Sequence, residues 1–410
     1  MLSMHTNPVA QPGTGDAGGM NVYVSQLAAH LGRLGVTVDM VTRVPDSADT
    51  RVTDISNHVR LWEIPAGAPG LVKAELAAVV VPFAENALAA LTANGGETID
   101  IVHSHYWISG LAGLALATAA GAPLVHSMHT MGRVKNAYLA PGDKSEPAER
   151  LAGEAMIVQR AAALIVASAH EGEDIVNYYD GDAAKIYEVT PGVNHRVFHP
   201  EAGLGIAAKQ QLRRGLGVAY DGALVLFAGR IQKLKAPDVL VEALAQLPSD
   251  TRLAVVGGPS GDPSVMRELH ALVARLGLDA RVSFHDPVPP ARLADWFRAA
   301  DVVAVPSYNE SFGFVAAEAM ACGTPVVGAA VGGLREIIDD GVSGFLVGGH
   351  EPALWADALR KALANPARRA ELAMGAAQRG QRFSWDATAR QTEQVYEAVL
   401  GERALAAQMS

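Results

Sequence analysis

The chain has 410 residues, of which 50% are hydrophobic and 19% are charged, a composition typical of a well-packed globular protein. A chain of this length exceeds the size at which one hydrophobic core keeps growing, so we expect two domains of about 200 residues each. The net charge of −10 argues against nucleic-acid binding, which requires a basic face, but it leaves room for local basic pockets that bind phosphorylated small molecules.

Cys322 is the single cysteine, so the chain can form no internal disulfide and no zinc site built on two thiolates. Its neighbours are Ala, Met and Gly, which favours a buried structural thiol over a nucleophile. No stretch reaches 18 uninterrupted apolar residues, and the amino end lacks the basic region and apolar core of a secretory signal. We therefore expect a cytoplasmic protein that does not span a membrane.

Strands and helices alternate along the whole chain, in the pattern that parallel β-α-β units produce. Apolar, β-branched runs predict five strands in the first half: Val36–Thr42, Ile101–His105, Pro123–Met128, Ala163–Ser168 and Ile186–Thr190. A hinge rich in Pro and Gly follows, and then six further runs predict strands: Ala223–Gly229, Arg252–Gly257, Arg281–His285, Asp301–Pro306, Pro325–Ala329 and Gly344–Val347.

These elements predict the α/β class, with two doubly wound, Rossmann-like domains that face each other across a cleft. We place the first domain at residues 1–195 and the second at residues 196–383. Residues 384–410 contain a last helix, from Asp386 to about Leu400, which we expect to cross back to the first domain.

A glycine-rich stretch near the amino end contains a literal G-x-G-x-x-G pattern at Gly13, Gly15 and Gly18, with Asp39 at nearly the dinucleotide-fold distance. The dinucleotide fingerprint requires its glycines directly after a strand, whereas polar and turn residues intervene here. We favour a loop that feeds a helix over residues 21–31, whose N-terminus can receive a phosphate or a sugar hydroxyl. For the first two glycines, a plain turn is the alternative interpretation.

In the second half, a pair of cations and a pair of carboxylates each follow a predicted strand. Arg230 and Lys235 come after one strand, and Glu310 and Glu318 come after another with seven residues between them. The C-terminal edge of a parallel sheet is where α/β proteins bind ligands. Two cations there suit a diphosphate, and two carboxylates suit the hydroxyls of a sugar nucleotide. The alternative is an ordinary helix start among solvated charges.

Histidines cluster after two strands of the first half. No carboxylate or cysteine stands at metal-ligand spacing from His103 or His105, so we expect no catalytic metal there. We predict that His129 and Thr130, at the end of a strand, are polar groups of the cleft, and that His103 and His126 are core residues.

Taken together, these motifs resemble glycosyltransferase family 4, whose members have the GT-B fold. The resemblance runs over nearly the whole chain and is carried by Ser3–Thr6, Gln11–Asp16, Gly18–Asn21, His103–Trp107, Val134–Asn136, Arg230 with Lys235, and Asn309–Gly313 with Glu318. The Arg/Lys and Glu/Glu pairs are typical of the broad family. The first-half motifs are similar to those of members that glycosylate inositol phosphate in mycothiol biosynthesis.

The resemblance implies a retaining transfer of N-acetylglucosamine from UDP-N-acetylglucosamine to 1D-myo-inositol 3-phosphate. The catalytic residues that it implies are His129, Arg230, Lys235 and Glu310. The implied donor-binding residues are Gln11, Pro12, Gly19, Arg230, Lys235, Val288, Glu310 and Glu318. The implied acceptor-binding residues are His5, Asp16, Gly19, Met20, Asn21, Lys73, Tyr106, Thr130 and Arg150. Without the resemblance, Lys73 and Arg150 would pass for solvated helix charges.

Two further expectations come from the resemblance alone. Family members hold an ion at main-chain carbonyls, which correspond here to Phe297, Arg298, Ala300 and Thr324, and a magnesium ion at this site would be structural at most. The reaction itself needs no cofactor. We also expect a homodimer, with no nucleic-acid or membrane partner.

Rival functions share part of this pattern. A sucrose-phosphate-synthase-like or phosphatidylinositol-mannosyltransferase-like enzyme would share the Arg/Lys and Glu/Glu pairs and would differ at the acceptor residues. The lipid-acceptor version would also need a basic or apolar patch that faces a membrane, and no such run is evident. In a different class, the chain could bind a UDP-sugar without turning it over.

The amino end departs from the resemblance. The resembling proteins begin with several more residues, so Met1–Met4 would supply barely half of the first strand. A misassigned start codon is the simplest explanation, and a weakened or inactive paralogue is the alternative. We expect a chain extended upstream to melt at a higher temperature, because a shortened central strand leaves neighbouring backbone groups unpaired.

Overall fold

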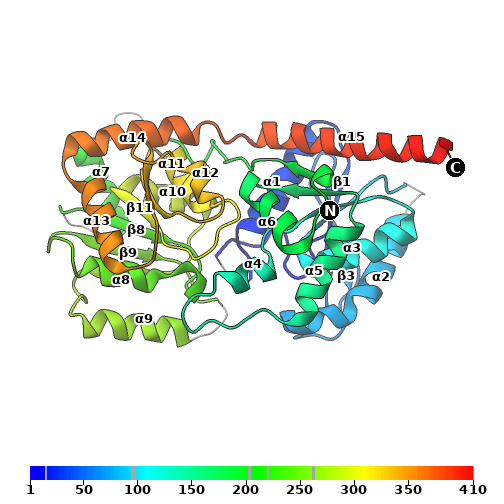
Figure 1. Cartoon of the computed structure of the whole chain (residues 1–410), viewed down its shortest axis with the longest axis horizontal. Helices are drawn as coiled ribbons and strands as arrows, with labels where there is room; N and C mark the ends of the chain where they lie inside the picture. The colour runs from blue at the N-terminus through cyan, green and yellow to red at the C-terminus, as the bar shows by residue number, and fades with distance from the viewer. Residues whose placement is uncertain (14–15, 94–97, 202–204, 219–220, 261–263, 410) are drawn as a thin grey trace.

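The computed structural model describes residues 1–13, 16–93, 98–201, 205–218, 221–260 and 264–409. Two α/β lobes lie side by side, each built on a sheet of mainly parallel strands, and the last two helices run along one edge of the molecule (Figure 1). The α/β class and the paired doubly wound lobes predicted from the sequence are confirmed. Gly15, which belongs to the literal G-x-G-x-x-G pattern, lies outside the described residues.

The first lobe contains two sheets. One has the strand order β1-β3-β2, with β1 (Val38–Val44), β3 (Val59–Pro65) and β2 (Arg51–Ser56), and β2 runs antiparallel to β3. The other has the order β4-β5-β6-β7, all parallel, with β4 (Val102–His105), β5 (Leu124–Ser127), β6 (Ala163–Val166) and β7 (Ile186–Glu188). The sequence analysis missed β2 and β3, although β3 alternates between buried and less buried positions.

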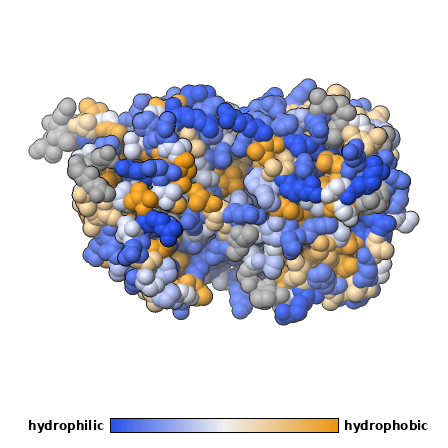
Figure 2. Space-filling model, turned by 180° about the vertical axis from the view of Figure 1, so that it is seen from behind, coloured by the Kyte–Doolittle hydropathy of each residue, from blue (hydrophilic) through white to orange (hydrophobic). Residues whose placement is uncertain are grey.

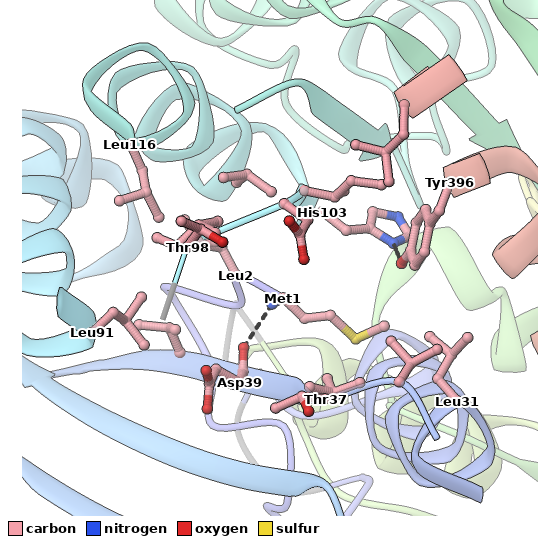
Figure 3. A pocket seen from close by; sticks show the side chains of 18 of the residues that line it. Met1, Leu2, Leu31, Thr37, Asp39, Leu91, Thr98, His103, Leu116 and Tyr396 are labelled. Atoms are coloured by element: carbon pink, nitrogen blue, oxygen red, sulfur yellow. Dashed lines mark hydrogen bonds between the residues drawn. The ribbon is translucent and has the colours of Figure 1, made fainter. Parts of the chain in front are cut away.

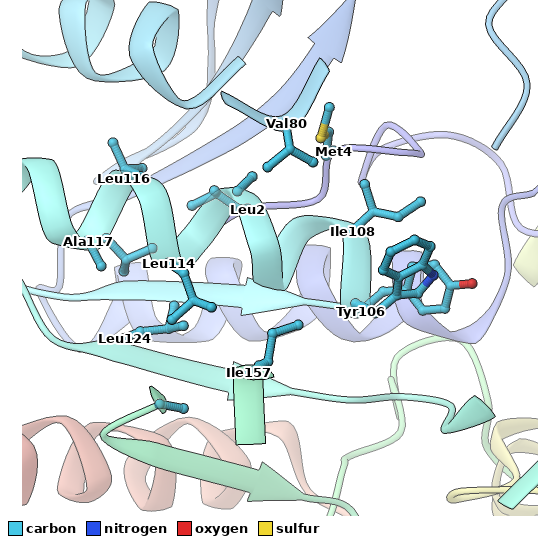
Figure 4. Packing of buried hydrophobic residues seen from close by; sticks show 14 of the residues in the cluster. Leu2, Met4, Val80, Tyr106, Ile108, Leu114, Leu116, Ala117, Leu124 and Ile157 are labelled. Carbon is cyan, nitrogen blue, oxygen red and sulfur yellow. The ribbon is translucent and has the colours of Figure 1, made fainter. Parts of the chain in front are cut away.

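Helices cover these sheets on both faces, as parallel strands require. The helical elements of the lobe are α1 (Gly19–Arg33), η1 (Lys73–Val79), α2 (Val80–Ala93), α3 (Trp107–Ala120), α4 (Gly132–Ala137), α5 (Ala148–Arg160), α6 (Ala169–Tyr179) and η2 (Ala183–Lys185). In the hydrophobic core of this lobe, Ile108 and Leu116 of α3 belong to the same buried cluster as Leu2 and Val80 (Figure 4). Burying one such side chain stabilises the fold by roughly 1.5–3 kcal/mol.

The second lobe contains one parallel sheet with the order β10-β9-β8-β11-β12-β13. Its strands are β8 (Leu224–Ala228), β9 (Arg252–Val256), β10 (Val282–His285), β11 (Val302–Val305), β12 (Val326–Ala329) and β13 (Gly344–Val347). Its helical elements are α7 (Ile206–Gly215), η3 (Lys233–Lys235), α8 (Pro237–Leu244), α9 (Ser264–Arg275), α10 (Pro290–Ala299), α11 (Phe314–Ala321), α12 (Leu334–Ile337), α13 (Pro352–Leu363) and α14 (Pro366–Gly380). The strand order reverses direction between β8 and β11, which makes the carboxyl ends of these strands a binding crevice.

The last helix, α15 (Trp385–Met409), leaves the second lobe and packs on the first. Trp385 and Ala389 complete a hydrophobic cluster with side chains of α1 and β1, and Val395 and Val399 complete another with β5 and β6. At the crossing, the N–H of Val193 donates to the carbonyl of Phe383 at 3.1 Å. A Cβ at Gly192 would lie 2.1 Å from the nitrogen of Trp385, so only glycine fits there.

The amino end forms backbone bridges to both sheets of the first lobe, through Leu2 to Val41 and to Ser104 (Figure 3). Leu2 exchanges hydrogen bonds with His103 and His105 of β4, at 2.8 and 3.1 Å, and Val41 of β1 donates to the Met1 carbonyl at 2.8 Å. Beyond Met1, a cavity of about 620 Å³ separates β1 from β4. We refer to this cavity as the slot.

Residues of β1 line one side of the slot, and residues of β4 line the other. Along a strand, successive N–H groups point to opposite sides. On β1 the N–H of Val38 points toward β3, and the N–H of Val41 points the other way, toward Met1. The N–H of Asp39 points to the same side as that of Val41 and therefore into the slot. By the same alternation, the N–H of His103 points into the slot from β4. A single extended segment could therefore accept a hydrogen bond from each wall.

Adding about four apolar, β-branched residues before Met1 is expected to raise the melting temperature, because two strand hydrogen bonds contribute roughly 1–3 kcal/mol and the apolar lining is covered as well. Thermal unfolding followed by circular dichroism measures the change. An added segment of equal length with alternating prolines is the control, since the fixed φ of proline, about −65°, departs from the φ of an extended strand. Equal melting temperatures for the two extended chains would show that the slot takes no strand.

One stretch of the described residues, Glu75–Ala93, has the length and the mean hydropathy, 1.7, of a membrane-crossing helix, and 28% of that window is buried. Core helices of globular domains meet the same criteria. Here Leu76, Val80 and Phe83 are buried in the core of the first lobe. On the face of the molecule shown in Figure 2, hydrophilic residues cover much of the surface and the hydrophobic ones form separate patches.

Candidate functional site

A cavity of about 380 Å³ lies between the two lobes, and residues of both lobes line it. A second cavity, of about 190 Å³, adjoins it on the side of the second lobe and shares Arg230, Lys235 and Glu310. A third, of about 280 Å³, adjoins it on the side of the first lobe and shares His5 and Lys73. Most of the predicted site residues line one of these three cavities, and we call the three cavities together the cleft.

The predicted cation and carboxylate of the second lobe meet in the cleft. Lys235 ends η3 after β8, and Glu310 lies in the turn after β11. The Lys235 ammonium pairs with Oε1 of Glu310, and the hydroxyl of Ser307 donates to the same oxygen at 2.9 Å. The strand ends therefore bring the two residues together, as the sequence indicated, and two donors hold the carboxylate in place.

Glycines of the first lobe make close approaches across the cleft. A Cβ at Gly18 would lie 3.5 Å from Nε of Arg230, and one at Gly19 would lie 2.9 Å from the Phe314 ring. The resemblance implies that Gly19 binds both donor and acceptor. In the structure, the first neighbours of Gly18 and Gly19 are side chains of the opposite lobe, so glycine here also permits the lobes to approach.

Glu318 lies on α11 and lines the second cavity together with Val288 and Pro12. Its side chain is buried, and burial raises the pKa of the carboxyl to about 8. At neutral pH the group is therefore mostly protonated, so it can both donate and accept a hydrogen bond, as a pair of hydroxyls requires. Gln11 lies beside Pro12 in the loop that leads to this cavity.

Lys73, Tyr106 and Arg150 converge from three separate elements of the first lobe. The Lys73 ammonium lies 4.3 Å from the centre of the Tyr106 ring, and the Arg150 guanidinium lies 5.0 Å from it. Burial lowers the pKa of Lys73 to about 8, with Arg150 and Arg230 nearby lowering it and Asp16 raising it. The hydroxyl of Thr130 accepts a hydrogen bond from Arg150 at 3.0 Å.

Arg150 is not a solvated helix charge, as the residues alone suggested. Its side chain is 4% exposed and pairs with the fully buried Glu154 at 2.8 Å and with Glu146 at 3.0 Å. Glu154 also accepts hydrogen bonds from the N–H of Gly132 and from the hydroxyl of Tyr179. The i, i+4 spacing of the three charges is the sequence signal that could have revealed this network.

The remaining predicted acceptor residues surround this group. His5 packs against the Tyr106 ring at 4.6 Å, and Met20 and the exposed Asp16 line the same cavity. The Asn21 side chain is buried and already paired, since its amide nitrogen donates to Thr6 and Asn7 and its oxygen accepts from the N–H of Gly18. Asn21 therefore braces the glycine loop at the start of α1.

His129 stands at the end of β5 with a φ of +58°, a conformation that is rare for residues other than glycine. Burial lowers the pKa of its imidazole to about 3, so the ring is neutral at physiological pH. One ring nitrogen pairs with His105 at 3.0 Å, and the main-chain carbonyl accepts a hydrogen bond from Ser311 at 2.6 Å. His103 and His126 are buried and paired with hydroxyls, in agreement with their predicted core positions.

Several hydrogen bonds join the lobes across the cleft. Besides the Ser311 bond, Ser168 donates to the Ser311 carbonyl at 3.2 Å, and Lys233 donates to the Gly142 carbonyl at 3.1 Å. Glu336 of α12 accepts from the N–H of His170 at 3.0 Å, at the N-terminus of α6. Sequence reasoning missed these contacts, because no local pattern identifies a partner on another lobe.

The residues of the predicted ion site come together at the C-terminal end of α10. The Phe297 carbonyl accepts hydrogen bonds from the Thr324 hydroxyl, at 2.7 Å, and from the N–H of Ala300. The Arg298 guanidinium binds the carbonyls of Val197 and His199. Within the part of the chain that the structure describes, no group of three or more His, Cys, Asp or Glu side chains could hold a metal ion.

Two family models match the chain. The model described as "Glycosyl transferase 4-like domain" matches residues 18–192, and the model described as "Glycosyl transferases group 1" matches residues 208–379. The chain is 51% identical to the D-inositol 3-phosphate glycosyltransferase of Xylanimonas cellulosilytica over 397 residues, which cover 97% of this chain and 95% of the relative. It is 48% identical to the protein of that name from a Nocardioides strain, with 98% and 90% covered.

Solved structures agree with the sequence comparisons. A sucrose-phosphate synthase from Thermosynechococcus elongatus superimposes with a TM-score of 0.87 and 33% identity, with 98% of each chain covered. The Anabaena protein Alr3699/HepE, solved in complex with UDP and glucose, superimposes with a TM-score of 0.76 and 21% identity, with 97% of this chain and 98% of that chain covered. Both solved structures share the two-lobed arrangement described above.

Proposed function

Because the chain belongs to the D-inositol 3-phosphate glycosyltransferase family, within the group 1 glycosyl transferases of GT-B fold, we propose that it transfers N-acetylglucosamine from UDP-N-acetylglucosamine to 1D-myo-inositol 3-phosphate. The products are the α-linked N-acetylglucosaminyl-inositol phosphate and UDP, as in the first step of mycothiol biosynthesis. The enzyme acts in the cytoplasm on soluble substrates.

The donor occupies the second cavity and the adjoining part of the cleft. Arg230 and Lys235 bind the diphosphate, and Glu310 binds the transferred sugar. Glu318, protonated at neutral pH, binds the ribose hydroxyls, and the main chain at Val288 meets the uracil. Gln11, Pro12 and Gly19 close the cavity from the first lobe. Two cations on one diphosphate match its charge in the ground state and stabilise the charge that grows on it as the glycosidic bond breaks.

The acceptor lies against the first lobe. Lys73, Tyr106, Thr130 and Arg150 hold its phosphate, and His5, Asp16, Gly19, Met20 and Asn21 shape the space for the inositol ring. The single observation that carries this assignment is the convergence of two cations, the buried Arg150 and the half-buried Lys73, on the Tyr106 ring in a cavity that opens into the cleft. A point charge, a guanidinium fork and two hydroxyls together form the donor set that a phosphate requires.

Transfer then proceeds on one face of the sugar, with retention of configuration. The bond between the anomeric carbon and the diphosphate breaks, and its electron pair stays on the diphosphate, which Arg230 and Lys235 stabilise. The acceptor hydroxyl bonds to the same face of the anomeric carbon and passes its proton to the leaving phosphate oxygen. His129, with its neutral ring and its main-chain carbonyl beside the cleft, tolerates positive charge at the anomeric carbon because it adds none of its own.

Release of UDP from UDP-N-acetylglucosamine tests this proposal, with 1D-myo-inositol 3-phosphate and unphosphorylated inositol compared as acceptors. We expect release with the phosphorylated acceptor only. Tight UDP binding without release for either acceptor would overturn the acceptor assignment, and it would leave a transferase with another acceptor or a UDP-sugar-binding protein. The 33% identity to a sucrose-phosphate synthase makes sugar phosphates the second class of acceptor to assay.

Replacing Lys73 with Ala is expected to raise KM for the phosphorylated acceptor by roughly 10- to 100-fold, the usual effect of losing one charged hydrogen bond. No carboxylate pairs with Lys73 among the contacts of the described residues, so stability should change little. In the wild type, the acceptor KM should also rise as the pH passes 8, because a Lys73 with a pKa of about 8 loses its charge there. Initial rates against acceptor concentration between pH 6.5 and 9 measure both effects, and a KM that stays flat with pH in the wild type would contradict the role of Lys73.

The ion and the dimer remain proposals that rest on the resemblance. Main-chain oxygens at the C-terminal end of α10 suit a hard cation such as magnesium, which would have a structural role. The turn already pairs the Phe297 carbonyl with Thr324, so such an ion would bind weakly. Light scattering on the purified protein would show whether it is a homodimer.

A further inference from the structure

Glu171, at the start of α6, is a carboxylate of the cleft that the assignments above leave without a function. It lies three residues after the cap residue Ser168, whose hydroxyl accepts from the Glu171 N–H at 3.2 Å. One carboxylate oxygen, Oε2, accepts from the N–H of Ala167 at 2.7 Å. This arrangement resembles a capping box, and it accounts for only one of the two oxygens.

The other oxygen, Oε1, is buried without a hydrogen-bond partner in the described structure. The Glu171 side chain is 4% exposed, so water contributes little to its solvation. A buried carboxylate oxygen left unpaired is costly, and such atoms are rare in folded proteins unless a ligand completes them. The cap function would be served as well by glutamine, which keeps one acceptor oxygen.

Glu171 lines the cleft opposite the turn that carries Glu310. The main cleft cavity and a smaller space beside it both have Glu171 on one wall and Asn309, Glu310 and Ser311 on the other. The bond from Ser168 to the Ser311 carbonyl fixes the distance between the two walls close to Glu171. A sugar held by Glu310 therefore lies within the space that Glu171 faces.

We propose that Glu171 is a sugar-binding residue that accepts a hydrogen bond from a hydroxyl of the transferred sugar, so that carboxylates of both lobes hold the sugar between them. The inference rests on the proposed function, because it takes the sugar of a nucleotide donor to be bound by Glu310. Glu171 acts on selection and orientation of the sugar, and it takes no part in bond breaking.

The charges around Glu171 make this contact dependent on pH. Burial, opposed by the hydrogen bond from the Ala167 N–H and aided by Asp174 on α6 and Glu336 on α12, raises the pKa of Glu171 to about 7. Tyr23, a neutral hydroxyl whose pKa is itself raised, also interacts with Glu171. The carboxylate that accepts from a sugar hydroxyl thus forms as the pH rises through 7.

Glu171→Gln is the test, with binding of UDP and of UDP-N-acetylglucosamine measured separately by calorimetry. We expect the affinity for the UDP-sugar to fall on the order of tenfold, the usual effect of losing a hydrogen bond to a charged group, with UDP affinity unchanged. In the wild type, the UDP-sugar affinity should rise between pH 6 and 8, and the variant should lack this rise. Equal losses for UDP and for UDP-sugar, or no loss for either, would overturn the proposal.

Two controls separate this contact from the cap. Ser168→Ala removes both the cap bond to the Glu171 N–H and the bond to the Ser311 carbonyl, so it loosens the wall in general and should weaken UDP and the UDP-sugar alike. The melting temperature provides the second control. The pKa of Glu171 is raised from 4.5 to about 7 in the folded protein, so folding is accompanied by proton uptake between these two pH values. Above pH 7 the folded protein holds the buried carboxylate in its charged form, and this destabilises the wild type. Glu171→Gln should therefore melt higher than the wild type at pH 8 and equally at pH 5. If UDP-N-acetylglucosamine fails to bind the wild type, the proposed function fails, whereas a selective loss in the variant concerns Glu171 alone.

Discussion

Lys235→Ala is expected to lower kcat by about 10²- to 10³-fold, the usual consequence of removing one donor that stabilises developing charge. The Lys235 ammonium lies at the C-terminal end of the second sheet, where the proposed reaction places the leaving diphosphate, and it pairs with Glu310, the carboxylate that we propose to bind the sugar. Steady-state UDP release at saturating donor and acceptor measures the loss.

The fold should survive this substitution. Glu310 keeps a hydrogen bond from Ser307, and Lys235 is only partly buried, so no buried charge is left alone. Lys233→Ala, in the same turn, is the matched control, because the half-buried Lys233 donates to one carbonyl, that of Gly142, and lines none of the cleft cavities described above. Lys235→Arg keeps the charge with a different shape and should recover part of the rate. A Lys235→Ala enzyme with a near-normal kcat would remove Lys235 from the mechanism.

Arg150→Ala is expected to destabilise the protein by roughly 3–5 kcal/mol, the usual cost of removing one partner from a buried ion pair. Glu154 is fully buried beneath Arg150, and without the guanidinium its charge has no cation beside it. Denaturant unfolding measures the loss of stability. Acceptor-dependent UDP release should disappear at the same time, because the phosphate loses its guanidinium fork.

A double variant separates these two consequences. Arg150→Met with Glu154→Gln removes both charges while the Gln oxygen can still accept from Gly132 and Tyr179. We expect most of the stability to return, since well-packed neutral groups replace buried pairs at little cost. Acceptor turnover should stay absent. If turnover returned with stability, Arg150 would be a structural residue only.

The fold could be predicted from the sequence wherever strands are buried on both faces. In β8 and β11 every residue is buried, and each strand is an uninterrupted apolar run in the sequence. In β2 every residue is exposed, so no apolar pattern marks it, and its hydrogen bonds to β3 define it instead. The extra antiparallel strand was missed for this reason.

Some residues of the candidate site could likewise be predicted from the sequence, and others could not. Arg230, Lys235, Glu310 and Glu318 could be predicted because each follows a strand, and the sheet edge collects them. Lys73 lies on a short 3-10 helix, and only the tertiary contact with Tyr106 distinguishes it from a surface lysine. Its place in the acceptor site came from the resemblance. Glu171 could not be predicted at all, because its sequence pattern is that of an ordinary helix cap.

The path of α15 has a consequence for biosynthesis. A ribosome releases the residues of the first lobe early and those of α15 last, yet Trp385 and Ala389 fill the cluster formed by Tyr23, Val24 and Leu27. The nascent first lobe therefore carries an exposed apolar face throughout translation of the second, a period in which exposed apolar surface favours aggregation. Folding of the first lobe can be completed only after the start of α15 has left the ribosome, and truncated translation products that lack α15 should depend on chaperones to stay in solution.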